Sequence, residues 1–235
     1  MTNNHPFPMY DFPERPQEKT LFFPSREEHA QQLEGRLHQQ PGPGACVVCH
    51  PHPQHGGTMD NKVVDTAVRS AAAQGYSTLR FNYRGVGKSE GIYGEGRLEV
   101  FDLLGAIDVL LQETQATSLV LCGFSFGTAV ISDTVAQTPT LLPQHSHSQL
   151  HAVVLIAPPL SMRALPTFAV PPQGLHMILG AQDEFCTTER FQKHAQAFSG
   201  DVQHYVLPES GHFFHGFLPE LSSFLQHAVN HTPKR

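Results

Sequence analysis

The sequence predicts an α/β fold with a mostly parallel central sheet, helices on both faces and no large cap domain. Short apolar runs of strand length alternate with longer segments whose apolar residues recur at helical spacing. The chain has 235 residues, 40% of them hydrophobic, which is enough for one sizeable core. We therefore expect one domain over residues 17–235, preceded by a Pro-rich N-terminal arm over residues 1–16.

The expected elements follow in chain order. The apolar runs predict strands near residues 21–23, 33–37, 45–49, 77–83, 118–122, 151–157, 175–180 and 202–207. The amphipathic segments predict helices within residues 60–75 and near residues 97–114, 126–137, 187–199 and 216–230. The segment 158–172 contains five prolines, which disfavours a helical lid there and predicts an open site.

Composition narrows the range of partners. The net charge is −6, and no basic tract is present, so neither nucleic acid nor an anionic membrane is an expected partner. No apolar run approaches the roughly 18 residues of a membrane helix, and the N-terminus lacks the apolar core of a signal peptide. We expect a cytoplasmic protein.

The four cysteines indicate buried free thiols in a reducing compartment and not a disulfide framework. They are Cys46, Cys49, Cys122 and Cys186. The spacing Cys46-x-x-Cys49 is that of a redox motif. It lies within a predicted strand instead of opening a helix, so we do not expect redox chemistry.

A candidate nucleophile lies in the run GFSFG, residues 123–127. It fits G-x-S-x-G and joins a predicted strand to a predicted helix, which is the context that gives this motif its meaning. Such a turn projects the hydroxyl of Ser125 above the sheet edge, at the N-terminus of a helix. The alternative is an ordinary strand–helix turn flanked by small residues.

A serine hydroxyl is a weak nucleophile and needs a base, which in turn needs an orienting acid. Asp183 follows a predicted strand, and His212 lies between the last strand and the last helix. The order Ser125, Asp183, His212 matches the triad order nucleophile, acid, histidine. The neighbours Glu184 and His215 are the competing candidates. A third rival, Asp201, precedes the last strand and so lies at the wrong end of it.

The run HPHPQH, residues 50–55, has two interpretations. His50, His52 and His55 could bind a metal ion, but the Asp of a metallo-hydrolase H-x-H-x-D-H box is replaced by Gln54. The run could instead form an oxyanion loop, in which one N–H donor comes from Phe126 and the other from this loop. Pro51 and Pro53 have no N–H, which leaves His52, Gln54 and His55, and position favours His52.

The run NYRGVGKS, residues 82–89, ends like a phosphate-binding P-loop. Asn82 stands where the first glycine belongs. The sequence that follows, EGIYGEG, does not open a helix, and a phosphate cradle needs a helix N-terminus. An NTPase is therefore not expected.

Six runs, taken together, resemble a group of small, lidless bacterial α/β-hydrolases related to dienelactone hydrolases and small esterases. In chain order they are VVCHPHPQHGGTMDNKVV, LRFNYRGVGKSEG, GFSFG, LIAPP, GAQDEF and GHFFHG. The resemblance covers about residues 32–228. It implies the α/β-hydrolase fold and a triad of Ser125, Asp183 and His212, and it leaves the substrate and the N-terminal arm open.

We therefore expect a carboxylesterase-like or thioesterase-like serine hydrolase (the EC 3.1 class) that cleaves a small ester or thioester through an acyl-enzyme, without a cofactor or metal. The alternatives are a metal-dependent hydrolase that uses His50, His52 and His55, and a non-catalytic α/β-hydrolase-like binding protein. The sequence leaves open whether the chain forms a homodimer.

Overall fold

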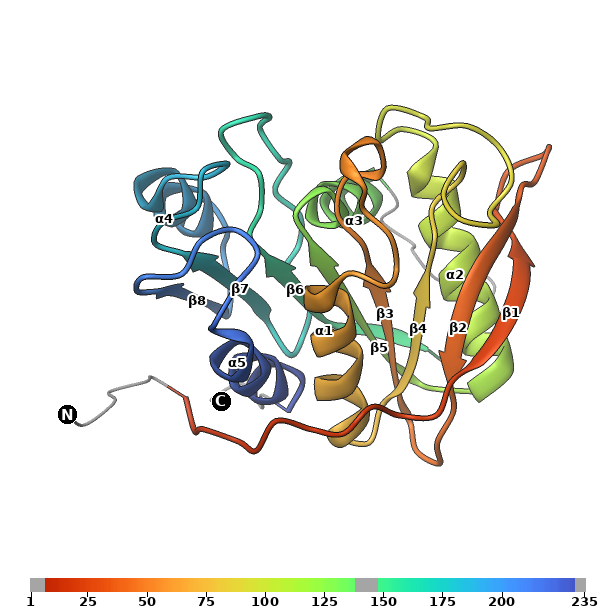
Figure 1. Cartoon of the computed structure of the whole chain (residues 1–235), viewed down its shortest axis with the longest axis horizontal. Coiled ribbons are helices and arrows are strands. Elements are labelled where there is room, and N and C mark those ends of the chain that lie inside the picture. Colours follow the sequence, from red (N-terminus) through yellow and green to blue (C-terminus); the bar gives the residue numbers. More distant parts are fainter. Residues whose placement is uncertain (1–6, 138–147, 231–235) are drawn as a thin grey trace.

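The protein, in a computed structural model, is described over residues 7–137 and 148–230. One sheet of eight strands runs in the order β1-β2-β4-β3-β5-β6-β7-β8 (Figure 1). The strands are β1 Lys19–Pro24, β2 Gln32–His38, β3 Gly44–Cys49, β4 Ser77–Phe81, β5 Ser118–Phe124, β6 Gln149–Ile156, β7 Leu175–Gly180 and β8 Val202–Leu207. The pairs β1–β2 and β2–β4 are antiparallel, and every other pair is parallel.

Helices cover both faces of the sheet (Figure 1). They are α1 Lys62–Ala73, α2 Glu99–Thr114, α3 Phe126–Gln137, α4 Thr188–Gln196 and α5 Leu218–Val229. Helices α1 and α5 contact each other on one face, whereas α2 and α3 contact each other on the opposite face. This split follows from right-handed crossovers, because the chain moves toward one sheet edge through α1 and toward the other through α2 and α3.

The central strands are apolar along their whole length because helices cover both of their sides. Every residue of β3, β4, β5 and β7 is buried. Cys49 pairs with Gly123, and Phe124 pairs with Ile156. The carboxyl ends of β3, β5 and β6 therefore lie together at one edge of the sheet, where ligands of open α/β sheets bind.

The predicted fold class is confirmed, and residues 7–137 and 148–230 include no large cap. The segment 157–174 contains only turns and irregular backbone, as its prolines predict. Several strand boundaries differ from the prediction by one or two residues, and two of them bear on the site. Strand β4 ends at Phe81: the N–H of Asn82 still donates to the carbonyl of Glu34 in β2, but its side chain bonds to Met59 and the N–H of Tyr83 bonds to His50. Strand β5 continues through Gly123 to Phe124, directly into the turn at Ser125.

The four cysteines are buried free thiols. Burial raises the pKa of the Cys49 thiol to about 12 and raises that of Cys46 further, which is the opposite of what redox chemistry requires. Within the described residues, no helix has the length and apolar character needed to cross a membrane. Residues 1–6 of the expected N-terminal arm lie outside the described part of the chain.

Candidate active site

The turn between β5 and α3 places the hydroxyl of Ser125 at the cavity. Ser125 has a φ of 53°, in the left-handed region that non-glycine residues rarely adopt. Its N–H donates to the carbonyl of Ile156 at 2.9 Å, and its carbonyl accepts the N–H of Thr128 at 2.9 Å. The glycine at 127 lets α3 approach β3 closely, since a Cβ there would lie 2.5 Å from the carbonyl oxygen of Cys49. The strained turn is thus fixed by close packing.

Three side chains from separate loops form a continuous hydrogen-bonded chain. The Oγ of Ser125 lies 2.9 Å from Nε2 of His212. The Nδ1 of His212 lies 2.8 Å from Oδ2 of Asp183. Because the carboxylate can only accept, Nδ1 carries the proton, and Nε2 is left to accept from the serine hydroxyl. The three predicted residues are therefore brought together in the geometry of a nucleophile, a base and an orienting acid.

The competing candidates lie elsewhere. Glu184 and His215 are exposed and have no hydrogen bond to the Ser125–His212–Asp183 chain. Asp201 precedes β8, at the opposite end of that strand from His212. Asp183 is also held by its second oxygen, since Oδ1 accepts the N–H of Phe185 at 2.7 Å. Both of its oxygens are thus occupied.

Three aromatic rings pack against the imidazole of His212. The ring centroids of Phe185, Phe124 and Phe213 lie 4.6, 5.1 and 5.1 Å from that of His212. His212 is only 3% exposed. The rings limit the approach of water and hold the imidazole in one orientation, which favours a short hydrogen bond to Ser125.

The loop of residues 50–58 follows β3 and lies beside the N-terminus of α3. Its backbone includes a 3₁₀ turn, η1 Pro53–His55. The N–H of Gln54 donates to Nδ1 of His52 at 3.3 Å, and that of His55 to the carbonyl of His52 at 3.1 Å. Among the described residues, the N–H groups of His52 and Phe126 have no such partner. Of the three donors that the prolines leave, His52 is therefore the one available.

The histidines of this loop do not converge on a common point. His50 is fully buried and both of its nitrogens are used: Nδ1 bonds to the carbonyl of Pro51 at 2.6 Å and Nε2 accepts the N–H of Tyr83 at 3.1 Å. Burial lowers the pKa of His50 to about 4. In the described parts of the chain, no group of three His, Cys, Asp or Glu side chains could hold a metal ion. The interpretation of this run as a ligand cluster is not supported.

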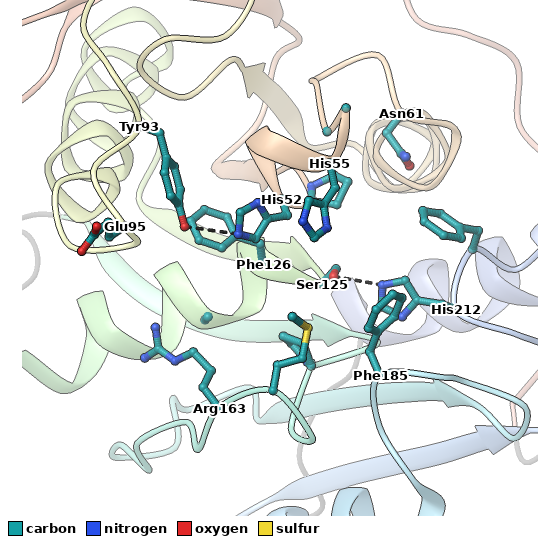
Figure 2. A pocket seen from close by; sticks show the side chains of 17 residues that line it. His52, His55, Asn61, Tyr93, Glu95, Ser125, Phe126, Arg163, Phe185 and His212 are labelled. Atoms are coloured by element: carbon teal, nitrogen blue, oxygen red, sulfur yellow. Dashed lines mark hydrogen bonds between the residues drawn. The ribbon is translucent and has the colours of Figure 1, made fainter.

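A cavity of about 280 Å³ lies over Ser125 and is open to solvent. Figure 2 shows His212 and Phe185 on one side of Ser125, and Glu95 and Arg163 on the other. Most of the lining is apolar. It comprises Pro51, His52, His55, Gly56, Gly57, Asn61, Tyr93, Glu95, Ser125, Phe126, Ala129, Pro159, Met162, Arg163, Phe185, His212 and Phe213.

Several lining residues were not predicted from the sequence. Tyr93 and Arg163 come from irregular loops after β4 and β6, and both reach the cavity. The hydroxyl of Tyr93 lies 3.2 Å from Nε2 of His52. Arg163 is held by both oxygens of Asp133 at 2.8 Å. The signal that points to them is positional, because loops at the carboxyl ends of parallel strands surround ligand sites.

The P-loop-like run at residues 82–89 forms no phosphate cradle. The next helix, α2, begins only at Glu99. The N–H of Lys88 already donates to the carboxylate of Glu34 at 3.0 Å, so this donor is not free for a phosphate. This agrees with the expectation from the sequence.

Comparisons with known proteins agree with this geometry. The model of the family described as serine aminopeptidase, S33 matches residues 43–204. An α/β serine hydrolase homologue from Coxiella burnetii is 29% identical, with a TM-score of 0.75, and the match covers 91% of this chain and 97% of that one. An α/β serine hydrolase without a lid from Xanthomonas campestris is 28% identical, with a TM-score of 0.76, over 97% of this chain and 99% of that one.

An uncharacterized protein from Rickettsia prowazekii (strain Madrid E) is 40% identical over 112 residues, which are 46% of this chain. The matched stretch spans only 47% of that relative's length. The family match, by contrast, covers more than half of this chain and includes β3, β5, β7 and the turn at Ser125. The chain therefore belongs to the family described as serine aminopeptidase, S33, in the α/β-hydrolase superfamily.

Proposed function

We propose that this protein is a serine hydrolase that cleaves a small carboxylic ester or thioester through an acyl-enzyme formed on Ser125. The observation that carries the proposal is the continuous chain from Ser125 through His212 to Asp183, with contacts of 2.9 and 2.8 Å, at the floor of a cavity. A serine in this arrangement is activated by the adjacent base.

In the proposed mechanism, His212 accepts the hydroxyl proton as Oγ of Ser125 attacks the substrate carbonyl. Asp183 stabilises the imidazolium that forms. The N–H groups of His52 and Phe126, together with the N-terminus of α3, stabilise the negative charge on the carbonyl oxygen. His212 then donates the proton to the leaving oxygen or sulfur. A water molecule, deprotonated by His212, attacks the acyl-enzyme, and the proton returns to Ser125 as the acid is released. No cofactor takes part.

The same mechanism orients the substrate. His212 must reach the leaving group, so the leaving group occupies the side of the cavity near Phe185 and Phe213, whose rings lie against that of His212. The acyl group then points to the opposite side, toward Tyr93 and Arg163. A volume of about 280 Å³ lies at or below the lower end of the range for small-molecule sites. The cavity therefore favours a short acyl chain and a mainly apolar substrate.

An aminoacyl ester or amide is a second candidate substrate, and Glu95 favours it. The carboxylate of Glu95 lines the acyl side of the cavity, where it could bind an α-ammonium group. The matching family is described as serine aminopeptidase. Turnover of an amino acid p-nitroanilide that falls at least tenfold in Glu95→Gln would favour this candidate. Turnover of simple acyl esters alone would favour the first.

The test of the mechanism combines labelling with turnover. A fluorophosphonate probe should label the wild-type protein at Ser125, and Ser125→Ala should abolish both labelling and the turnover of p-nitrophenyl acetate. A chelator should leave wild-type turnover unchanged. Undiminished turnover by Ser125→Ala would contradict the mechanism, whereas loss of turnover with the chelator would favour a metal-dependent hydrolase. A panel of p-nitrophenyl esters and thioesters of increasing chain length then identifies the acyl preference.

A further inference from the structure

The orientation of the proposed oxyanion donor depends on how its loop is held. Within residues 50–58, the carbonyl of His52 accepts two N–H groups, from His55 at 3.1 Å and from Gly57 at 3.0 Å. A Cβ on Gly57 would lie 2.2 Å from the carbonyl oxygen of Pro51, so the turn is closed tightly on itself. The loop therefore behaves as one piece, and its two ends decide where the N–H of His52 points.

The first end of the loop is attached at His50. The Nε2 atom of His50 accepts the N–H of Tyr83, and the two rings lie 4.5 Å apart. Tyr83 belongs to the segment that follows β4. The beginning of the loop is thus attached to residues just beyond the end of that strand.

The other end of the loop is attached to the same segment through Met59. The N–H of Met59 donates to Oδ1 of Asn82 at 2.9 Å, and its carbonyl accepts from Nη1 of Arg80 at 3.2 Å. All three residues are buried. Both backbone groups of Met59 are therefore satisfied by side chains from residues 80–82, on the same strand end that holds His50.

The side-chain amide of Asn82 has only one orientation that satisfies its neighbours. Its Nδ2 donates to Oε2 of Glu34 at 2.9 Å, so its oxygen must face the N–H of Met59. Its own N–H donates to the carbonyl of Glu34 at 2.8 Å, which fixes its backbone as well. Asn82 is not among the residues that line the cavity at Ser125, so its effect on turnover must be indirect.

From these contacts we infer that Asn82 is a positioning residue, which through Met59 holds the loop of residues 50–58 so that the N–H of His52 faces the substrate oxygen. The inference rests on the proposed function. Misplacing a donor by about 1 Å can cost about 100-fold in rate, so a side chain that never touches the substrate can control turnover in this way.

The test compares Asn82→Ala with Ser89→Ala. Asn82→Ala removes the acceptor for Met59. Ser89→Ala is the matched control, because Oγ of Ser89 bonds to the carbonyl of Asn82 at 2.7 Å and to the N–H of Glu34 at 2.9 Å but not to Met59. Each variant is assayed in the full chain for kcat and KM on p-nitrophenyl acetate, for active sites labelled by a fluorophosphonate, and for inhibition by an alkylboronic acid. The boronic acid adds to Ser125 and places an oxygen at the proposed oxyanion position.

Asn82→Ala should lower kcat per labelled site by roughly 10- to 100-fold with little change in KM. The inhibition constant of the boronic acid should rise by a similar factor. Ser89→Ala should leave all three quantities within about twofold, even if its melting temperature falls. A structural role alone would reduce the number of labelled sites without changing the boronic acid affinity of those that remain.

A pair of charge-exchanged variants tests the same inference if Asn82→Ala does not fold. Asn82→Asp keeps an oxygen that can accept the N–H of Met59. Its second carboxylate oxygen, however, lies opposite the carboxylate of Glu34, and the two repel each other. Adding Glu34→Gln removes the repelling charge and supplies an amide N–H that can donate to the second carboxylate oxygen at position 82, at the cost of the acceptor for the N–H of Lys88. The single variant should lose kcat and the double variant should regain most of it. Equal kcat in the two, or an unchanged kcat per labelled site in Asn82→Ala, would overturn the inference. Turnover that does not depend on Ser125 would instead overturn the proposed function.

Discussion

Asp183 uses both of its carboxylate oxygens, one for His212 and one for the N–H of Phe185. Asp183→Asn leaves a single oxygen for two N–H donors. If the amide nitrogen faces His212, the imidazole must carry its proton on Nε2, and it can no longer accept from Ser125. We expect kcat to fall by roughly 10³- to 10⁴-fold with KM little changed, measured on a p-nitrophenyl ester.

The neighbouring carboxylate supplies the control for this prediction. Glu184 is exposed and has no hydrogen bond to His212. Glu184→Gln should therefore keep kcat within about twofold of the wild type. If Glu184→Gln lost as much activity as Asp183→Asn, the assignment of the orienting acid to Asp183 would be wrong.

The buried imidazole of His50 leads to a second prediction, which concerns how the free energy of unfolding depends on pH. Its pKa is lowered to about 4 by burial, below the 6.5 of an ordinary imidazole. Between pH 6.5 and pH 4 the unfolded chain therefore binds a proton that the folded chain excludes, so the free energy of unfolding falls as the pH falls. The expected loss is on the order of 1–3 kcal/mol over this window.

Urea unfolding at pH 7 and pH 5 measures this contribution. Other groups titrate in the same range. The informative quantity is therefore how much free energy of unfolding is lost between pH 7 and pH 5 in the wild type compared with His50→Asn. The variant should be less stable at pH 7 and should lose less stability on acidification. An equal loss in both proteins would mean that His50 is not held neutral.

The sequence predicts the residues of this site better than their environment. G-x-S-x-G, the position of Asp183 after a strand and that of His212 before the last helix are local patterns, and the structure brings these residues together as expected. The role of His50 could not be predicted in this way. Its contact with the carbonyl of Pro51 is local, but its other partner, the N–H of Tyr83, is known only once β3 and β4 lie side by side.

At the scale of elements, the close approach of α3 to β3 aligns the turn at Ser125 with the loop after β3. Gly127→Ala would place a Cβ 2.5 Å from the carbonyl oxygen of Cys49, and backbone cannot swing aside as a side chain can. We expect a loss of roughly 1–3 kcal/mol in the free energy of unfolding. We also expect a fall in kcat, because Cys49 directly precedes the loop that carries His52.

Gly75→Ala is the control variant, which separates the effect of crowding from the effect of backbone strain. Gly75 has a φ of 85° but no atom within 4 Å of a Cβ, so its substitution strains the backbone without displacing a neighbour. It should cost about 1 kcal/mol and leave kcat unchanged. Calorimetry and ester turnover on both variants separate the two effects. Equal kcat in Gly127→Ala and the wild type would contradict the proposed coupling of turn and loop.

The end of a strand is harder to predict from the local sequence than the strand itself. The apolar run predicts a strand to Tyr83, but β4 ends at Phe81. The N–H of Asn82 still donates to the carbonyl of Glu34 in β2, whereas the N–H of Tyr83 donates to Nε2 of His50 in the loop after β3, a partner that no local pattern shows. Strand order is likewise a property of the assembled sheet, since β4 lies between β2 and β3.

At the scale of the whole molecule, the N-terminal arm connects helices that the sequence separates widely. Figure 1 shows it passing below α5 and α1 before it enters β1. The N–H of Tyr10 donates to Oγ of Ser223 in α5, and Arg15 pairs with Asp65 in α1, each at 3.0 Å. Its Pro-rich composition predicted only an arm, because these partners lie at the other end of the chain or in another element.

The ring of Phe7 packs this arm against the rest of the protein, and the last prediction concerns its contribution to stability. Its ring packs edge-on against Tyr205 of β8 and Phe224 of α5, with centroids 5.2 and 5.6 Å away, and it is 6% exposed. Phe7→Ala removes this buried contact, and we expect the free energy of unfolding in urea to fall by roughly 2–4 kcal/mol. Activity per folded molecule should not change, because none of residues 7–18 lines the cavity.

Phe22 is the matched control, because it lies on the edge strand β1 with 51% of its surface exposed. Phe22→Ala should cost less than about 1 kcal/mol, since little apolar surface is returned to water. Both variants remove the same atoms, so the difference between them isolates burial of the arm. If the two variants lost equal stability, the arm would not contribute to the core in solution. A kcat that fell with Phe7→Ala would instead mean that the arm and the candidate active site are coupled.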